Sequence, residues 1–302
     1  MTKNIIETRD LTVFYGKTRG IADVNLAVQQ GEVFGFLGPN GAGKTTTQRV
    51  LLDIIRPTRG TAAIFGMDCQ TKGVNIRKRV GYLPGELSLY PNMKGEDFLD
   101  MLASLQEGSA ERTYRQQLYD RLDFDPSRKM KAYSRGNKQK VGVIAAFMAK
   151  PDLLILDEPT SGLDPLVQQT VLELVAEAKA DGRTVFFSSH ILPEVQAVCD
   201  RVGIIREGKL IKTERVETLM KQQFKRLNLT FAQLPPTNAF VLEGVAETGR
   251  AEMTVMLEVR KNLDKVLEIA APLGIVDIET PPVTLEEIFL AFYARDNGGS
   301  HA

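Results

Sequence analysis

A glycine-rich segment carries the clearest chemical signal in the sequence, because it fits the pattern GxxxxGK[ST] of a phosphate-binding loop. Its residues are Gly38, Pro39, Asn40, Gly41, Ala42, Gly43, Lys44 and Thr45. The glycines let the backbone curl so that its N–H groups face a triphosphate. We expect Lys44 to reach the β- and γ-phosphates and the Thr45 hydroxyl to bind Mg²⁺. The alternative is a glycine-rich turn that matches this pattern by accident.

Two adjacent carboxylates follow an apolar run at residues 153–156, and such a pair is typical of a metal site beside a general base. In an α/β fold, a buried strand delivers its last residues to the rim of the sheet, where ligands bind. We expect Asp157 to hold Mg²⁺, directly or through water, and Glu158 to orient and deprotonate an attacking water. The alternative is a solvated acidic turn that opens the loop through Pro159.

His190 comes directly after a third strand-like run, at residues 184–189, and the other histidine, His301, is in the C-terminal tail. A neutral imidazole after this strand can touch both the γ-phosphate and the water that Glu158 activates. His190 is therefore a candidate sensor of the γ-phosphate. The alternative is a core histidine whose hydrogen bonds are satisfied inside the protein.

The elements that must position these residues follow the pattern of a parallel α/β sheet. Residues 33–37 form an apolar strand pattern, and the glycine-rich loop after it leads into a helical pattern. The apolar side of that helix is expected to carry Val50, Leu51, Ile54 and Ile55. The runs at 153–156 and 184–187 are each followed by a helical stretch, as parallel strands require.

Other segments predict structure around this sheet. Residues 5–32 alternate like antiparallel strands, and residues 201–212 read as a hairpin that turns at Glu207-Gly208. Residues 97–128 have helical periodicity in two pieces, split near 107–109. From Leu227 the pattern changes to short β-like pieces with one helix near 262–271.

These patterns predict three parts of the chain. Residues 1–220 form an α/β domain that contains the helical insertion at about 88–132. Residues 221–295 form a small C-terminal α+β domain, with a last helix from Leu285. Residues 296–302 form a flexible tail.

Composition and charge exclude several classes of function. Of 302 residues, 43% are hydrophobic, and 38 basic residues balance 38 acidic ones, so we expect no direct binding of nucleic acid. Cys69 and Cys199 have no metal-binding spacing, which favours a reduced intracellular compartment. The charged N-terminus does not fit a signal peptide, and no window approaches the roughly 18 apolar residues of a membrane span.

Three segments in this order and spacing resemble the ATP-binding subunits of ATP-binding cassette (ABC) transporters. They are GPNGAGKTT at 38–46, LLILDEPTSGLD at 153–164 and SSH at 188–190. The resemblance covers about residues 5–218 and implies a P-loop ATPase core that binds ATP and Mg²⁺. The catalytic residues that it implies are Lys44, Glu158 and His190, with Thr46 added to the nucleotide contacts.

The resemblance also implies residues that act across a dimer of two such subunits. Tyr133-Ser134-Arg135-Gly136-Asn137 takes the place of the family's LSGGQ signature, and Ser134 would cap the helix that follows. The positive end of that helix, with Ser134 and Gly136, would face the γ-phosphate bound by the other subunit. Ser161-Gly162-Leu163-Asp164 resembles the D-loop, which joins the two sites. Tyr15 matches the aromatic residue on which adenine stacks.

The sequence departs from the family's usual pattern in two places. Arg135-Gly136 stands where most members have two glycines, and Asn137 replaces a glutamine; a guanidinium beside the γ-phosphate would help binding. In the loop 81–86, Gly85 stands where the family has a glutamine that contacts Mg²⁺. Either Glu86 substitutes as the magnesium contact or the contact is lost. These variants and the C-terminal domain resemble the subgroup that powers ABC-2 type exporters.

The resemblance implies partners and a location. We expect a homodimer that ATP closes and hydrolysis reopens, acting on a separate transmembrane permease for drugs or antibiotics. The location would be cytoplasmic, on the inner face of the cell membrane through the permease. An alternative is a soluble ABC-type ATPase that acts on nucleic acid or ribosomes, which the single cassette and zero net charge disfavour. Another is a regulatory subunit without hydrolysis, which intact Glu158 and His190 disfavour.

Overall fold

The structure is a computed structural model that describes residues 3–105, 112–221 and 224–281. By its internal contacts the chain divides into two compact units, residues 1–216 and 217–302. We call them unit 1 and unit 2 and describe each by itself.

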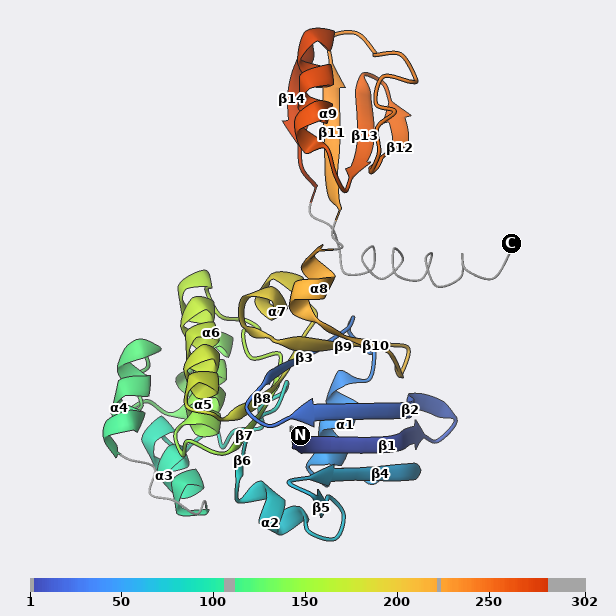
Figure 1. Cartoon of the computed structure of the whole chain (residues 1–302). Coiled ribbons are helices and arrows are strands. Elements are labelled where there is room, and N and C mark those ends of the chain that lie inside the picture. The colour runs from blue at the N-terminus through green and yellow to red at the C-terminus, as the bar shows by residue number, and fades with distance from the viewer. Residues whose placement is uncertain (1–2, 106–111, 222–223, 282–302) are drawn as a thin grey trace. The chain divides into compact units, whose positions relative to one another are not determined.

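A six-stranded sheet in the order β10-β9-β3-β8-β7-β6 forms the centre of unit 1 (Figure 1). Its strands are β3 (Val33–Leu37), β6 (Val80–Leu83), β7 (Leu153–Asp157), β8 (Thr184–Ser189), β9 (Arg201–Arg206) and β10 (Lys209–Arg215). Every residue of β3, β7 and β8 is buried, which explains why their sequences are continuous apolar runs. Because β3, β7 and β8 run parallel, the loops after them begin at one edge of the sheet.

The predicted hairpin closes this sheet. β9 and β10 pair antiparallel around the turn Glu207-Gly208, and both turn residues have positive φ, 48° and 76°. Two left-handed residues in a row match the twist of a two-residue hairpin. Glycine adopts this left-handed conformation without steric strain because it has no Cβ.

An antiparallel sheet in the order β2-β1-β4-β5 covers one part of the same core. Its strands are β1 (Asn4–Tyr15), β2 (Thr18–Gln29), β4 (Arg59–Ile64) and β5 (Met67–Asp68). The first two strands confirm the expectation for residues 5–32, whereas β4 and β5 were not predicted. Ile6 and Val24 of this sheet belong to one buried cluster with Phe34 and Phe186 of the central sheet, so the two sheets share a core.

Helices complete unit 1, including the predicted helical insertion (Figure 1). They are α1 (Lys44–Leu51), α2 (Gly73–Arg77), α3 (Gly95–Leu105), α4 (Arg112–Arg121), α5 (Arg135–Phe147), α6 (Pro165–Ala180) and α7 (Leu192–Val198), with a 3₁₀ turn at Met130–Ala132. A further helix, α8 (Val216–Lys221), starts at the last residue of unit 1. The insertion consists of α3 and α4, which both contact α5. The expected break at 107–109 lies outside the described residues.

Three boundaries differ from the sequence analysis. α1 was expected to include Ile54 and Ile55, but it ends at Leu51 because Asp53 is left-handed, with φ 55°. α4 ends before another left-handed residue, Asp123 with φ 46°, so the helix does not run on to 128. Residues 81–83, which we treated as a loop, belong to β6, which pairs with β7.

Residues 224–281 of unit 2 form an antiparallel sheet in the order β12-β13-β11-β14, with α9 packed on it. Its elements are β11 (Lys225–Phe231), β12 (Val245–Ala251), β13 (Thr254–Val259), α9 (Leu263–Ala270), a 3₁₀ turn at Ala271–Leu273 and β14 (Ile275–Glu279). Alternate residues of β11 and β13 are buried against Val266 and Ala270 of α9, as a half-buried sheet requires. The expected helix from Leu285 and the tail 296–302 lie outside the described residues.

Two further observations concern the chemistry that the fold leaves out. Among residues 3–105, 112–221 and 224–281, no helix is long and apolar enough to cross a membrane. Cys69 and Cys199 are both free and buried, and burial raises the pKa of the Cys69 thiol to about 12. A thiol with so high a pKa is a weak nucleophile at neutral pH.

Candidate functional site

A cleft of ≈ 570 Å³ lies at the edge of the central sheet where β3, β7 and β8 end. It brings together most of the residues that the sequence singled out: Tyr15, Asn40, Gly41, Gly43, Lys44, Thr45, Thr46, Glu86, Asp157, Glu158 and His190. The remaining loop residues, Gly38, Pro39 and Ala42, are not among the residues that line it. Segments more than 140 residues apart in the sequence therefore meet at one edge of the sheet, as the parallel topology predicts.

The loop after β3 is a tight backbone cradle that ends in α1. Gly43 has φ 110°, and a Cβ there would approach the Ile21 side chain to 2.5 Å, so only glycine fits. Lys44 is buried, and its Nζ donates hydrogen bonds to the carbonyl oxygens of Gly38 at 2.7 Å and Pro39 at 3.2 Å. The ammonium group is thus held within the loop at the positive end of α1, an arrangement suited to a polyphosphate.

Asp157, the last residue of β7, is buried and accepts two short hydrogen bonds. Thr45 Oγ1 donates to its Oδ2 at 2.6 Å, and Ser188 Oγ donates to its Oδ1 at 2.6 Å. Glu86 lines the same cleft and is exposed. Hydroxyl and carboxylate oxygens are the ligands that Mg²⁺ prefers, usually together with phosphate oxygens. The donor set at Thr45 and Asp157 therefore fits the predicted magnesium site.

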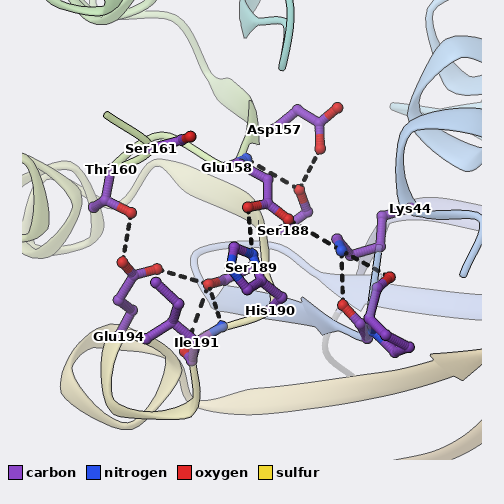
Figure 2. Close-up of polar contacts among 12 residues, drawn as sticks. Lys44, Asp157, Glu158, Thr160, Ser161, Ser188, Ser189, His190, Ile191 and Glu194 are labelled. Carbon is purple, nitrogen blue, oxygen red and sulfur yellow. Dashed lines mark hydrogen bonds and ion pairs between the residues drawn. The ribbon is translucent and has the colours of Figure 1, made fainter. Parts of the chain in front are cut away.

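Glu158 lies between a lysine and a histidine (Figure 2). Its Oε1 is 3.0 Å from Lys44 Nζ, and its Oε2 is 2.5 Å from His190 Nδ1. The residue is left-handed, with φ 52°, and its N–H donates to the Ser188 carbonyl at 3.2 Å. A non-glycine residue in this conformation is unusual and is found where the surroundings hold it for a purpose. The carboxylate is positioned to take a proton from a water molecule in the cleft.

His190 does not match the alternative of a buried core histidine. Its side chain is 43% exposed, and its ring contacts the Glu158 carboxylate (Figure 2). A histidine that lines the cleft beside a candidate base can bind a phosphate oxygen or orient the base. The geometry thus suits the role of phosphate sensor that we predicted.

Tyr15 and Gly85 define two opposite parts of the cleft. The Tyr15 side chain is half exposed and lies over Gly20, with its hydroxyl 3.4 Å from Thr46 Oγ1, so a ring face is open to solvent beside the loop. At Gly85, an added Cβ would lie 3.0 Å from Asp157 Oδ2. A side chain there would press on the carboxylate, which gives a physical reason for glycine next to Asp157.

The signature residues do not join this cleft. Ser134 caps α5 as expected, because its Oγ accepts a hydrogen bond from the Asn137 N–H at 3.2 Å. Neither Ser134 nor Gly136 is among the residues that line the cleft. The guanidinium of Arg135 instead donates to Ser161 Oγ at 3.4 Å, which places the start of α5 beside the 161–164 loop. That loop begins α6, whose cap is Asp164.

Sequence reasoning missed two residues that support the site. The Ser188 hydroxyl donates a hydrogen bond to Asp157 and accepts one from the Glu158 N–H. Its position two residues before His190 was the sequence feature that could have identified it. Gln139 of α5 donates from Nε2 to the carbonyl oxygens of Glu158 and Pro159, each at 3.2 Å. A polar residue on the buried side of a helix is a weak signal, because its partner is not visible in the sequence.

Comparisons with known proteins all find ABC transporter proteins. A family model described as ABC transporter matches residues 21–161. An uncharacterised ABC transporter ATP-binding protein of Nostoc sp. is 39% identical over 236 residues, which cover 74% of this chain and 70% of that protein. The bacitracin transport ATP-binding protein BcrA of Bacillus licheniformis is 38% identical, covering 74% of each chain. A solved ATP-binding subunit of an ABC transporter aligns with TM-score 0.67 at 30% identity, over 72% of this chain and 92% of that one.

Proposed function

Because this chain belongs to the ATP-binding subunits of ABC transporters, we propose that it powers a separate permease of the ABC-2 exporter type by closing as a homodimer around ATP. ATP is its nucleotide, and it is an ATPase. The observation that carries the proposal is the placement of the Glu158 carboxylate between Lys44 and His190, directly beside the phosphate-binding loop.

We propose one role in hydrolysis for each side chain, which the contacts in the cleft support. Lys44 and the loop backbone bind the β- and γ-phosphates, and Thr45 and Asp157 would hold Mg²⁺, which would neutralise phosphate charge. Glu158 takes a proton as the oxygen of water forms its bond to the γ-phosphorus, and the bond to the bridging oxygen of ADP breaks. His190 binds the γ-phosphate and keeps Glu158 oriented through the contact at its Nδ1. Tyr15 stacks on the adenine.

The placement of the signature residues supports a dimer. Ser134 and Gly136 lie at the exposed start of α5, outside the cleft of their own chain. A capped helix N-terminus offers backbone N–H groups to an anion, and in this family that anion is the γ-phosphate of the partner. Each site would then consist of the phosphate-binding loop of one chain and the signature of the other. ADP lacks the shared phosphate and would not hold the dimer closed.

An apolar groove of ≈ 460 Å³ supports a contact with the permease. Its apolar lining includes Leu52 and Ile54 after α1, Val74 of α2, Tyr82 of β6, and Leu102 and Leu105 of α3, and Arg77 and Lys78 add two basic side chains. Ile54, Val74 and Leu105 are 54%, 63% and 71% exposed, so the groove offers apolar surface to a partner. We propose that the groove binds a cytoplasmic segment of the permease through the apolar side of that segment.

Tyr82 links this groove to the catalytic cleft. Burial, and secondarily the nearby Asp157 carboxylate, raise the pKa of Tyr82 to about 12. The same strand continues into the loop with Gly85 and Glu86, which line the cleft. A segment bound in the groove would therefore sense the magnesium site through β6.

The antibiotic named for BcrA supports an exporter of drugs or antibiotics.

The permease contact is tested by Val74→Asp, with Val241→Asp as the matched control. Val241 is 80% exposed in unit 2 and lies outside the groove. We expect the amount of membrane permease that copurifies with Val74→Asp to be at least about five-fold lower than with the native chain. A carboxylate in an apolar contact raises the free energy of the complex. The measurement is quantitative mass spectrometry of the purified complex, with basal ATP turnover unchanged.

Equal recovery of the permease with both variants would contradict the groove assignment. Recovery of ribosomes or nucleic acid with the native chain, and of no membrane protein, would instead favour the alternative of a soluble ATPase that acts on those partners.

Removal of unit 2 tests whether it takes part in nucleotide binding. Every residue that lines the cleft lies in unit 1, so a chain truncated after Met220 is expected to bind ATP within about two-fold of the native affinity. Titration with a fluorescent ATP analogue measures this. A truncated chain that is folded by circular dichroism and yet does not bind would show that unit 2 completes the site.

A further inference from the structure

Glu194 is a buried carboxylate that the proposed chemistry does not use. It belongs to α7 and is only 7% exposed. Its Oε1 accepts a hydrogen bond from Thr160 Oγ1, and its Oε2 accepts one from Ser189 Oγ at 2.6 Å (Figure 2). Both hydroxyl groups belong to buried residues, 3% and 1% exposed. The three side chains form a buried polar layer next to the cleft.

The two partners of Glu194 lie next to the two residues that we assign as proton acceptor and phosphate sensor. Thr160 lies two residues after Glu158 in the loop that follows β7, and Ser189 directly precedes His190 at the end of β8. One carboxylate therefore joins the loop that carries the base to the strand end that carries the sensor. Figure 2 shows Glu194 between these two segments, on the side away from Lys44.

The loop that carries Glu158 needs such support. Glu158 is left-handed, a conformation that persists only where neighbouring contacts determine it. Gln139 of α5 holds its carbonyl from one side. Glu194 of α7 holds the loop two residues later, at Thr160. A shift of about 1 Å between groups that react together can cost ~10²-fold in rate, so these contacts have a direct chemical consequence.

Capping of α7 does not explain the whole arrangement. Among the described residues, no side-chain hydrogen bond caps α7, and Ser189 Oγ accepts a hydrogen bond at 2.9 Å from the N–H of Ile191, the residue before the helix. The bond from Thr160 crosses to a different segment, 34 residues away in sequence. Hydrogen bonds to an ionised acceptor are stronger than those between neutral groups, which suits a carboxylate at this position.

We propose that Glu194 is a positioning residue that fixes the Glu158 carboxylate relative to His190 by holding Thr160 and Ser189. The proposal rests on the proposed roles of Glu158 and His190. Glu194 does not touch the nucleotide, since it is absent from the residues that line the cleft. It acts through the geometry of the two residues that do line it.

The test uses Glu194→Gln, which keeps the shape of the side chain but removes its charge and turns one acceptor into a donor. We expect kcat for ATP hydrolysis to fall about 10- to 100-fold while KM changes less than about two-fold, because the reacting groups and not the phosphate contacts are displaced. The matched control is Glu173→Gln, the same change at an exposed position of α6, which leaves kcat unchanged. Thr160→Val removes one donor with little change of shape and is expected to lower kcat in the same direction.

A double mutant separates positioning from a general structural role. In the Glu158→Gln background, adding Glu194→Gln is expected to change the residual turnover less than about two-fold, because the group that it positions is already lost. A further large fall in that background, or a parallel loss of ATP affinity, would overturn the proposal. If Glu194→Gln does not fold, Thr160→Val and Glu158→Gln make the same comparison.

The roles of Glu158 and Glu194 can be tested separately. If Glu158→Gln retains full turnover, Glu158 is not the base and the proposed role of Glu194 has no target. If Glu158→Gln is impaired but both Glu194→Gln and Thr160→Val keep the native kcat, only the role of Glu194 is overturned.

Discussion

Replacing Glu158 by glutamine is expected to lower ATP turnover by roughly 10²- to 10⁴-fold while the chain still binds ATP. Glutamine keeps the size and hydrogen bonding of the side chain but cannot accept the proton of the attacking water. It also removes the charge that faces Lys44 at 3.0 Å, so phosphate groups no longer compete with a carboxylate for that ammonium. Phosphate release and equilibrium binding of ATP measure the two effects separately.

The matched control is Glu177→Gln, an exposed carboxylate on α6, which is expected to turn over at the native rate. The Glu158→Gln protein should also form a stable dimer with ATP, visible by size-exclusion chromatography, because the nucleotide that closes the dimer is not consumed. Turnover near the native rate in this variant would mean that another residue is the base.

Two inactive variants are expected to regain activity when they are combined in one dimer. In the proposed dimer, Lys44→Ala would damage the phosphate-binding loop of its own chain, whereas Ser134→Arg would block the γ-phosphate held by the partner chain. Each homodimer has two damaged sites. In the mixed dimer, both defects fall on one site and the other site consists of two intact halves, so about half of the native activity should return if one site turns over alone.

The mixed dimer must be isolated, because exchange among chains would otherwise also yield homodimers. Different affinity tags on the two chains allow purification through both, and native mass measurement confirms the composition. The control is a chain with both substitutions, paired in the same way with a native chain, in which each site keeps one damaged half. If the two kinds of mixed dimer have equal activity, Ser134 does not act across the interface.

Most of the site could be predicted because its signals are local. The glycine-rich loop, the pair Asp157-Glu158 and His190 each follow an apolar run that had to be a buried strand. Parallel strands end at one edge, so these segments had to meet, and the cleft contains them all. The buried strands of the central sheet followed from continuous apolar runs, and β1, β2 and the small α+β unit followed from alternation of apolar and polar residues.

The rest depends on tertiary contacts that no local pattern reveals. Ile54 and Ile55 continue the apolar period of α1, but the left-handed Asp53 ends the helix before them. The short strand β6 is found only through its pairing with β7. Glu194 and Gln139 look like ordinary helical residues until the folded chain brings loops far away in sequence against them.

The position of β3 in the central sheet affects how the chain can fold during its synthesis. Its two partners are β8 and β9, which follow it by roughly 150 residues in the sequence. At translation rates of about 5–20 residues per second, roughly 8 to 30 seconds pass after the strand Val33–Leu37 is made before its first partner has been made. During that interval this apolar strand has no partner in the sheet, and a chaperone can bind it and prevent its aggregation. The cleft cannot close around a nucleotide until about two thirds of the chain has left the ribosome.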